Sequence, residues 1–341
     1  MSQSLMPSPQ APVDLTALAN FAALRGQLRV SLTPQCNIAC RFCHNESDVP
    51  PPLMRIDRRQ RPRRRELDAR GVLTVVNAMM EAGLKRVYFT GGEPLLSPIA
   101  RPVMSELPDA GPDGSYTLIT NGTRVRANRT WLRRTRLGRL KVSLHYFSDD
   151  SLYEIAQTKL GIAAVLDGID AALELNRTVE LNCLLLKENA HEVRHILDYA
   201  LGRRLPMQFI ELVDTDFNSG MTGSAMSADG IISHLRTLTS DEHTVVAGVG
   251  QGRRIFRIDD VEVEVIHRDL GRYHVGQCGP CPKRHLCAEG FWALRVDHAG
   301  GVQPCLLRDD LRLKINHLLD DPAALLHAVA HHIDAFTKGT L

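Results

Sequence analysis

Residues 28–43 read LRVSLTPQCNIACRFC, a short apolar run followed by a loop with three closely spaced cysteines. The run at residues 28–33 predicts a β-strand, because it is short, largely apolar and ended by proline. Cys36, Cys40 and Cys43 then follow the carboxyl end of that strand. In parallel sheets this is the edge where active sites form. The stretch therefore predicts both a sheet and the place of its site.

Short apolar runs alternate with longer amphipathic runs as far as residue 212. The strand patterns lie at residues 28–33, 86–90, 116–120, 140–145, 179–186 and 207–212. The helical patterns lie at residues 68–82, 99–107, 130–136, 162–175 and 190–200. Strands joined by helices in this way predict an α/β fold with a parallel sheet, either doubly wound or curled into a partial (β/α)6 barrel of the open TIM type. We favour the partial barrel.

The pattern changes beyond residue 213. Residues 255–267 and 291–307 each predict a β-hairpin, and residues 322–336 predict an amphipathic helix. We therefore expect a flexible tail at residues 1–27, a barrel at residues 28–213 and a small C-terminal α+β region at residues 214–341. The tail is rich in Ser, Pro, Ala and Gln and lacks the apolar stretch of a secretory signal.

Composition excludes several classes of protein. The chain of 341 residues has a formal net charge of +2, and 23% of its residues are charged, which is typical of neither a nucleic-acid binder nor a disordered protein. No run of 18 apolar residues occurs, so we expect a cytoplasmic protein. Residues 55–65 contain seven arginines. They could hold an anionic substrate or RNA, but a solvated basic loop is favoured.

Seven of the eight cysteines fall into two groups, which in a reducing compartment indicates metal or cluster ligation. In the first group, Cys36, Cys40 and Cys43 provide three thiolates on one loop. Three thiolates can bind three irons of a four-iron cubane and leave the fourth iron without a protein ligand. A closed zinc site is the alternative, but it needs four ligands and usually has CxxC spacing.

A second motif, Gly91-Gly92-Glu93-Pro94, follows the second predicted strand. The glycines allow close approach of the backbone, and Glu93 offers an acceptor for an ammonium group. The cysteine loop and this motif together resemble those of the radical S-adenosylmethionine (SAM) superfamily, which usually has an aromatic residue at the position of Phe42. The resemblance implies a [4Fe-4S] cluster on the three cysteines, with the methionine end of SAM on its open iron.

The resemblance also assigns residues to SAM. It implies that Gly92 and Glu93 contact the methionine amino group, that Ser143 contacts the carboxylate or ribose, and that Phe42 lies beside the adenine. The residues assigned to the cofactor site in this way are Phe42, Gly91, Gly92, Glu93, Asn121 and Ser143.

The second cysteine group consists of Cys278, Cys281, Cys287 and Cys305. A four-cysteine zinc ribbon is one interpretation of this spacing. The sequence that follows, FWALRVDHAGGVQPCL at residues 291–306, resembles the part of the molybdenum-cofactor GTP 3′,8-cyclase family that carries an auxiliary [4Fe-4S] cluster. In that family the cluster has three cysteines and an open iron, whereas a fourth cysteine here could close that iron. The number of ligands stays open.

The likeness to these cyclases extends over residues 28–335. It implies that Arg29 and Arg295 stand where the cyclases hold GTP with arginines. At other such positions the chain differs, since Tyr88 and Ala293 replace family arginines. We therefore predict Arg29, Tyr88 and Arg295 as substrate contacts in an altered site.

We expect a radical SAM enzyme with SAM and two [4Fe-4S] clusters as cofactors. It would cleave SAM reductively to a 5′-deoxyadenosyl radical, which then removes hydrogen from a substrate. A small polar metabolite, such as a nucleoside or nucleotide-sugar of a specialised biosynthetic pathway, is favoured. Glu211, near the end of the last strand, is a candidate for proton transfer. An electron donor such as flavodoxin or ferredoxin is an expected partner, whereas a membrane or nucleic acid is not.

Other functions remain open. A divergent GTP 3′,8-cyclase is the main alternative, since Arg29 and Arg295 are retained. Modification of a peptide or of RNA is a further one, and a non-catalytic protein that binds zinc is a third.

Overall fold

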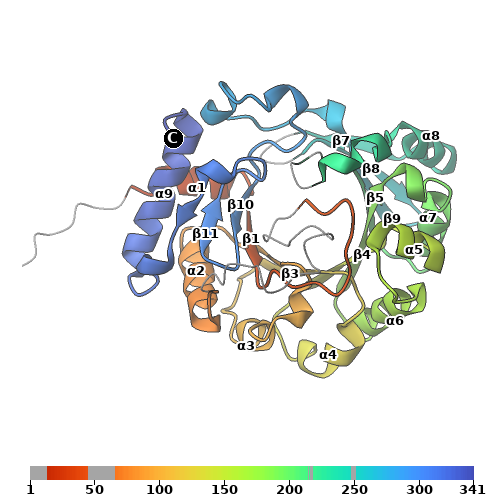
Figure 1. The fold of residues 1–341 in the computed structure, drawn as a ribbon, viewed down its shortest axis with the longest axis horizontal. Helices are drawn as coiled ribbons and strands as arrows, with labels where there is room; N and C mark the ends of the chain where they lie inside the picture. Colours follow the sequence, from red (N-terminus) through yellow and green to blue (C-terminus); the bar gives the residue numbers. More distant parts are fainter. Residues whose placement is uncertain (1–13, 45–65, 214, 216–217, 247–250) are drawn as a thin grey trace, which may run out of the picture.

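The computed structural model describes residues 14–44, 66–213, 215, 218–246 and 251–341. The basic segment at residues 55–65 lies outside this range. Strands form an open ring when viewed end on, and helices lie outside it (Figure 1). None of the helices in the described part of the chain is long and apolar enough to cross a bilayer.

Six parallel strands form the centre of the sheet and follow one another in chain order. They are β1 (Gln27–Ser31), β2 (Arg86–Thr90), β3 (Ser115–Thr120), β4 (Arg139–Ser143), β5 (Thr178–Leu185) and β6 (Met207–Glu211). Their order and direction confirm the predicted α/β fold of the partial-barrel type.

Strands from the last third of the chain extend this sheet at both edges. β10 (Ala293–Val296) pairs parallel with β1, and β9 (Val261–Ile266) pairs parallel with β6. Antiparallel strands continue beyond them: β11 (Gly301–Gln303) and β12 (Leu313–Lys314) next to β10, and β8 (Arg253–Ile258) and β7 (Glu242–Val245) next to β9. The two hairpins predicted from the sequence therefore join the barrel sheet. The boundary at residue 214 stays a prediction, although the sheet runs across it.

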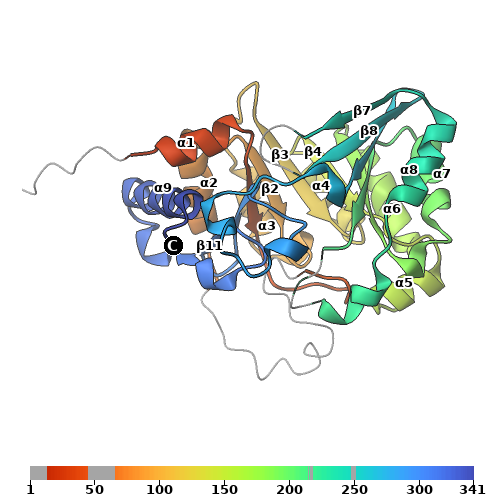
Figure 2. The same cartoon turned by 90° about the horizontal axis from the view of Figure 1, so that it is seen from above.

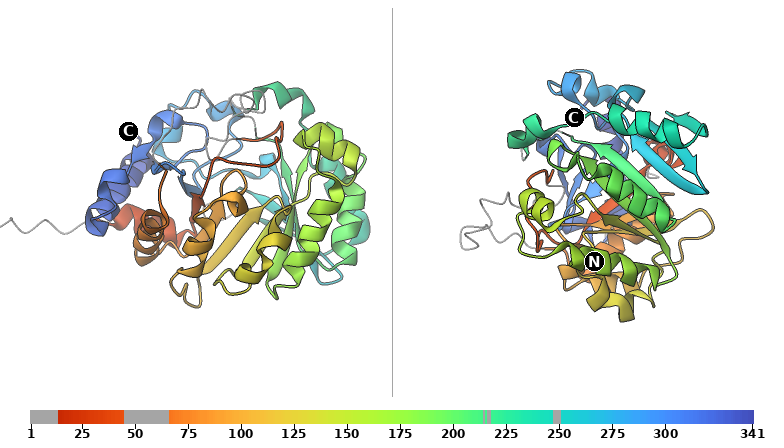
Figure 3. Two further views of the ribbon diagram at one scale, coloured as in Figure 1. Left: turned by 60° about the horizontal axis from the view of Figure 1, so that its bottom comes forward. Right: turned by 90° about the vertical axis from the view of Figure 1, so that its right-hand side faces the viewer.

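Helices cover the outer face of the sheet (Figure 3). They are α2 (Ala69–Glu81), α3 (Ala100–Ser105), α4 (Val125–Leu132), α5 (Asp149–Ala156), α6 (Ile162–Leu173), α7 (Val193–Gly202) and α8 (Asp229–Leu238). In α2 the side chains of Val72, Val75, Val76 and Met79 recur at helical spacing and are buried. The side chain of Asp68 caps this helix by accepting a hydrogen bond from the backbone of Gly71. Apolar periodicity thus places the helices on the sheet and leaves its inner face for the site.

The predicted tail at residues 1–27 is wrong for its second half. Thr16–Ala23 form helix α1, which lies beside α9 (Pro322–Lys338) (Figure 2). Leu18 and Phe21, three residues apart, are buried there, and the ring of Phe21 stacks on Phe291 with centroids 4.4 Å apart. The Ser- and Pro-rich composition of the segment concealed this short apolar stripe.

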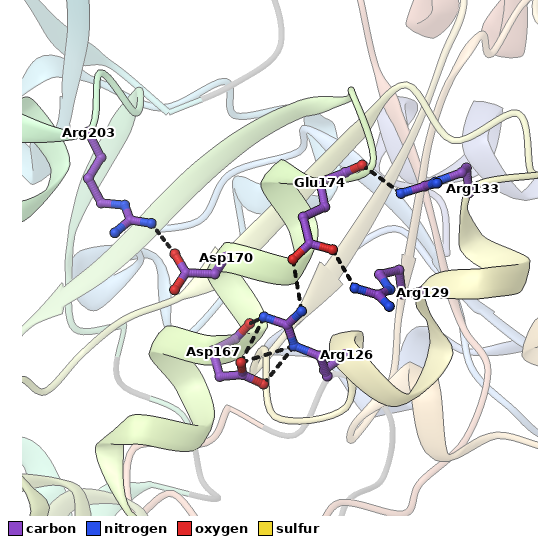
Figure 4. Close-up of polar contacts among 7 residues, drawn as sticks. All are labelled: Arg126, Arg129, Arg133, Asp167, Asp170, Glu174 and Arg203. Carbon is purple, nitrogen blue, oxygen red and sulfur yellow. Dashed lines mark hydrogen bonds and ion pairs between the residues drawn. The ribbon is translucent and has the colours of Figure 1, made fainter.

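Exposed ion pairs join the outer helices (Figure 4). Arg126 on α4 contacts Asp167 on α6 at 2.7 Å and Glu174, the C-cap residue of α6, at 2.8 Å, and Arg203 after α7 pairs with Asp170. These groups are open to solvent, so their contribution to the free energy of unfolding is small and falls with salt. The network lies on the outer surface, away from the inner face of the sheet.

Candidate active site

The three cysteines of the first group lie on the loop after β1 and share one cavity. This cavity, of about 160 Å³, opens at the carboxyl ends of β1 to β4. It brings together most residues predicted to bind the first cluster and SAM. They are Cys36, Phe42, Cys40, Cys43, Gly91, Gly92, Asn121 and Ser143. Glu93 is not among the residues that line it.

Gly91 and Gly92 hold the cysteine loop against the end of β2. The backbone N–H of Gly92 donates to the carbonyl of Thr33 at 2.8 Å, and that of Glu93 donates to the carbonyl of Gln35 at 2.7 Å. A Cβ at position 92 would lie only 2.2 Å from the Gln35 oxygen. The glycine pair is therefore required by the close approach of two backbones, one of which carries Cys36.

Glu93 joins the end of β2 to the end of β3. One carboxylate oxygen, Oε1, accepts from the Leu95 N–H at 3.0 Å and the Thr120 hydroxyl at 2.8 Å, and Oε2 accepts from the Asn121 N–H at 2.8 Å. Burial raises the pKa of Glu93 from 4.5 to about 7, while the donors of Asn121, Leu95 and Thr120 act to lower it. The side chain therefore braces the site, and its contact with the methionine amino group stays a prediction.

Glu93→Gln should lower the free energy of unfolding by roughly 1–3 kcal/mol, because an amide cannot accept from all three donors and sets an N–H against one of them. The pH dependence should also change. The folded-state pKa of about 7 lies above 4.5, so the free energy of unfolding of the wild type falls as pH rises between these values. Urea unfolding at several pH values measures both effects. Equal stability and equal slope in the two proteins would contradict this account.

Two asparagines orient the cysteine loop. The Asn121 side-chain amide donates to the Asn37 oxygen at 3.0 Å and approaches Cys36 Sγ at 3.9 Å. The Asn37 amide in turn donates to the Thr123 hydroxyl at 2.8 Å. The contact of Asn121 with SAM stays a prediction; the structure shows that Asn121 positions Cys36 through Asn37, a residue that was not predicted from the sequence.

The donor set around this cavity fits an iron–sulfur cluster. The three thiols face one space, and the fully buried Tyr146 hydroxyl, which lines it too, has no hydrogen-bond partner in the described part of the chain. Burial raises the pKa of Tyr146, and negative charge on Cys40 and Cys36 raises it further. No three His, Cys, Asp or Glu side chains among the described residues lie close enough to hold a single metal ion. Thiolates that bind different irons of a cubane are spaced more widely than ligands of one ion.

The second cysteine group gathers beside β10 and β11. Burial raises the pKa of Cys278, and the charges of Cys287 and Cys281 add to this rise. Burial likewise raises the pKa of Cys305 to about 11, with a contribution from Cys287. The backbone N–H of Gly290 donates to Cys287 Sγ at 3.5 Å. Cys287 therefore lies within electrostatic reach of Cys278 and Cys305, and Cys281 lies within reach of Cys278.

A larger cavity of about 440 Å³ adjoins the first. The two have six lining residues in common: Arg29, Phe42, His44, Ile119, Ser143 and His145. All residues predicted to contact substrate, Arg29, Tyr88 and Arg295, line the larger cavity, and so does Glu211. A molecule there would adjoin whatever fills the cysteine-lined cavity.

The arginines of the larger cavity are engaged with neighbouring side chains. Arg295 and Glu289 form an ion pair at 2.8 Å, and their side chains are only 3% and 5% exposed. The guanidinium of Arg295 lies over the Trp292 ring at 4.8 Å. Arg29 lies 5.4 Å from the Trp292 ring and 5.8 Å from that of Tyr88. Both arginines are thus part of a packed wall.

Glu211, the predicted proton-transfer residue, has a structural contact. Its carboxylate is buried and accepts from the backbone N–H of Ala228 at 2.9 Å, at the start of α8. It also lines the larger cavity, so its role in proton transfer stays a prediction.

His145 lies at the junction of the two cavities and was missed from the sequence. Its Nδ1 accepts from the backbone N–H of Leu184 at 2.9 Å, which leaves the ring proton on Nε2. Burial lowers the pKa of His145 to about 4, so the ring is neutral near pH 7. The alternation of Arg139, Lys141, Ser143 and His145 along one face of β4 and the residues after it was the available signal, since all four line the larger cavity.

The fold and site define a known class of protein. The sequence profile of the radical SAM superfamily matches residues 30–200, and the chain belongs to this superfamily. It is therefore a radical SAM enzyme, and SAM and a [4Fe-4S] cluster are the cofactors that membership implies.

Within this class, the chain is similar to proteins described as GTP 3′,8-cyclases. A probable GTP 3′,8-cyclase of Methanocella arvoryzae is 28% identical over 295 residues, 86% of this chain and 85% of the relative. The GTP 3′,8-cyclase of Campylobacter jejuni is 26% identical over 85% of this chain and 87% of the relative. GTP 3′,8-cyclase 2 of Pseudomonas aeruginosa is 27% identical over 90% of this chain and 91% of the relative.

Solved structures share the fold. SuiB of Streptococcus suis, bound to SAM, superposes with a TM-score of 0.58 at 11% identity, over 87% of this chain and 65% of SuiB. This chain thus spans just under two thirds of the SuiB chain. The protein anSMEcpe with bound AdoMet gives a TM-score of 0.58 at 14% identity, over 92% of this chain and 79% of the anSMEcpe chain. At these identities the likeness shows a radical SAM parallel sheet with a C-terminal antiparallel β region.

Proposed function

We propose that this radical SAM enzyme removes a hydrogen atom from a small polar metabolite, such as a nucleoside or nucleotide-sugar, in a specialised biosynthetic pathway. Reductive cleavage of SAM to a 5′-deoxyadenosyl radical is the chemistry that the bound cofactors supply. The observation that carries the proposal is the pair of adjoining cavities, which share Ser143, Phe42 and His145. A substrate in the larger cavity would lie next to the adenosyl group.

The roles of individual residues follow from the walls of the cavities. Cys36, Cys40 and Cys43 would hold the cluster, with Cys36 oriented through the asparagine pair. The backbone at Gly91 and Gly92 would adjoin the methionine end of SAM, where no side chain fits between the two loops. Ser143, Phe42 and Asn121 complete the proposed SAM site, and Arg29, Tyr88 and Arg295 belong to the substrate wall.

A second [4Fe-4S] cluster on Cys278, Cys281, Cys287 and Cys305 is part of the same proposal. The electrostatic coupling of Cys278 to Cys281 and Cys287, and of Cys305 to Cys287, supports one shared site. Cys305 immediately precedes Leu306, which lines the larger cavity, so this cluster would lie near the substrate. A low-potential donor such as flavodoxin or ferredoxin would supply the electron in the cytoplasm.

A divergent GTP 3′,8-cyclase is the second candidate function. Two observations favour it: the 26–28% identity to proteins described by that name, and the presence of Arg29 and Arg295 in the wall of the larger cavity. Incubation of the reduced enzyme with SAM and GTP, followed by mass spectrometry of the nucleotide, separates the two candidates. Conversion of GTP would favour the cyclase.

The primary test is iron, acid-labile sulfide and SAM cleavage in one sample. Anaerobically reconstituted protein should contain about eight irons and eight sulfides and form 5′-deoxyadenosine after reduction with dithionite. Zinc without sulfide or 5′-deoxyadenosine would refute the proposed function.

A further inference from the structure

The larger cavity has an unusual balance of charge. Among the residues that the structure describes, its lining includes six cationic side chains and five carboxylates, which differ in number by only one. They are Arg29, Arg86, Arg139, Lys141, Arg253 and Arg295, and Glu180, Glu211, Glu262, Glu264 and Glu289. A cavity built for a polyanion would present an excess of cations.

On one side of the cavity, each of two carboxylates contacts two donor side chains. Glu180 on β5 pairs with Arg139 at 3.0 Å and with Lys141 at 3.3 Å, both on the neighbouring strand β4. Glu264 on β9 pairs with Arg253 at 3.3 Å and accepts from the Gln208 amide at 2.5 Å. A phosphate at these positions would have to compete with the carboxylate that already pairs with the cation.

On the opposite side, Glu289 neutralises Arg295. The ion pair is almost fully buried, and the same carboxylate oxygen accepts from the Trp292 indole N–H at 3.0 Å. The indole thus holds Glu289 in place against the guanidinium. Displacing it with a phosphate would leave a buried carboxylate without its cation, which is strongly unfavourable.

We propose that this cavity selects a polar substrate of net charge near zero, rich in hydroxyl or amide groups, and that Glu289 excludes polyphosphates by neutralising Arg295. The inference rests on the proposed function, in which this cavity takes the substrate. Hydroxyl and amide groups both donate and accept, so each can use the carboxylate and the cation of one pair together. Phosphate oxygens only accept, and beside four of the six cations, Arg139, Lys141, Arg253 and Arg295, they meet a carboxylate of like charge.

The test measures binding of inorganic triphosphate, GTP and guanosine by calorimetry to anaerobically reconstituted protein saturated with SAM. The wild type should bind triphosphate with a Kd above about 1 mM, and it should bind GTP no more tightly than guanosine. Glu289→Gln should bind triphosphate at least about tenfold more tightly, because the side chain at position 289 no longer neutralises the charge of Arg295. Glu174→Gln, on the outer surface of α6, is the matched control. It makes the same change in net charge and should leave binding unaltered.

The binding measurements on the wild type test the charge selectivity of the cavity even if Glu289→Gln does not fold. Micromolar binding of triphosphate by the wild type, or GTP binding about tenfold tighter than guanosine binding, would overturn the proposal. A folded Glu289→Gln with no gain in triphosphate affinity would overturn the role of Glu289. SAM cleavage measured on the same sample reports separately on the proposed function, since it needs no substrate.

Discussion

Cys40→Ala is expected to reduce 5′-deoxyadenosine formation to background and to remove about half of the iron, about four of eight atoms. The thiol of Cys40 lines the smaller cavity with those of Cys36 and Cys43, so its loss leaves two ligands on a cluster that already has an open iron. Iron and sulfide analysis, together with chromatography of 5′-deoxyadenosine after dithionite reduction, measures both effects.

Cys281→Ala is the matched control for that variant. Cys281 belongs to the C-terminal group, so the first cluster should survive and some SAM cleavage should persist without conversion of substrate. Equal loss of all iron from both variants would argue against two independent sites. Full activity of Cys40→Ala would refute the assignment of the first cluster.

Gly92→Ala is expected to destabilise the protein by about 3 kcal/mol or more and to prevent assembly of the first cluster. The added methyl carbon would lie 2.2 Å from the Gln35 carbonyl oxygen and 3.0 Å from the Cys36 nitrogen, and both are backbone atoms. The loop must move away, and Cys36 moves with it. Thermal unfolding of the apoprotein and iron content after reconstitution report the two effects separately.

Gly230→Ala provides the comparison for this variant. Gly230 lies in α8, and among the described residues, apart from its two chain neighbours and the backbone of its own helix, no atom lies within 4 Å of the place that an added methyl carbon would take. The change should therefore be neutral or stabilising by about 0.5–1 kcal/mol. If Gly92→Ala behaves like Gly230→Ala, the close approach of the two loops is not what requires the glycine.

Local patterns were enough to predict the central strands but not the edges of the sheet. Predicted strands at residues 86–90 and 207–212 match β2 and β6 to within one residue, because each is a short run with several buried apolar side chains. The hairpins at residues 255–267 and 291–307 were also predicted. Their parallel pairing with β6 and β1 was not, because which edge a hairpin joins depends on contacts between distant parts of the chain.

The residues of the site likewise divide into those that local sequence patterns predicted and those that they did not. The three cysteines and the pair Gly91 and Gly92 directly follow the strands that carry them, so their place at the carboxyl ends of β1 and β2, where they line one cavity, could be predicted. Glu289 and Trp292 were not predicted because their role depends on contacts with Arg295 and Arg29. These residues come together only when β10 pairs with β1 in the folded sheet. Alternating polar residues on a predicted parallel strand, as on β4, are the sequence signal of a cavity-facing side.

The position of β1 between β2 and β10 has a consequence for synthesis on the ribosome. Arg29 is paired in register with Arg295, so one edge of β1 stays open until nearly the whole chain has emerged. The cysteine loop and its glycine support come from the first third of the chain and can assemble early. An exposed strand edge invites pairing with other chains, so the nascent protein is most prone to aggregate in this interval. The wall that contains Glu289 and Trp292 is completed only when β10 pairs with β1.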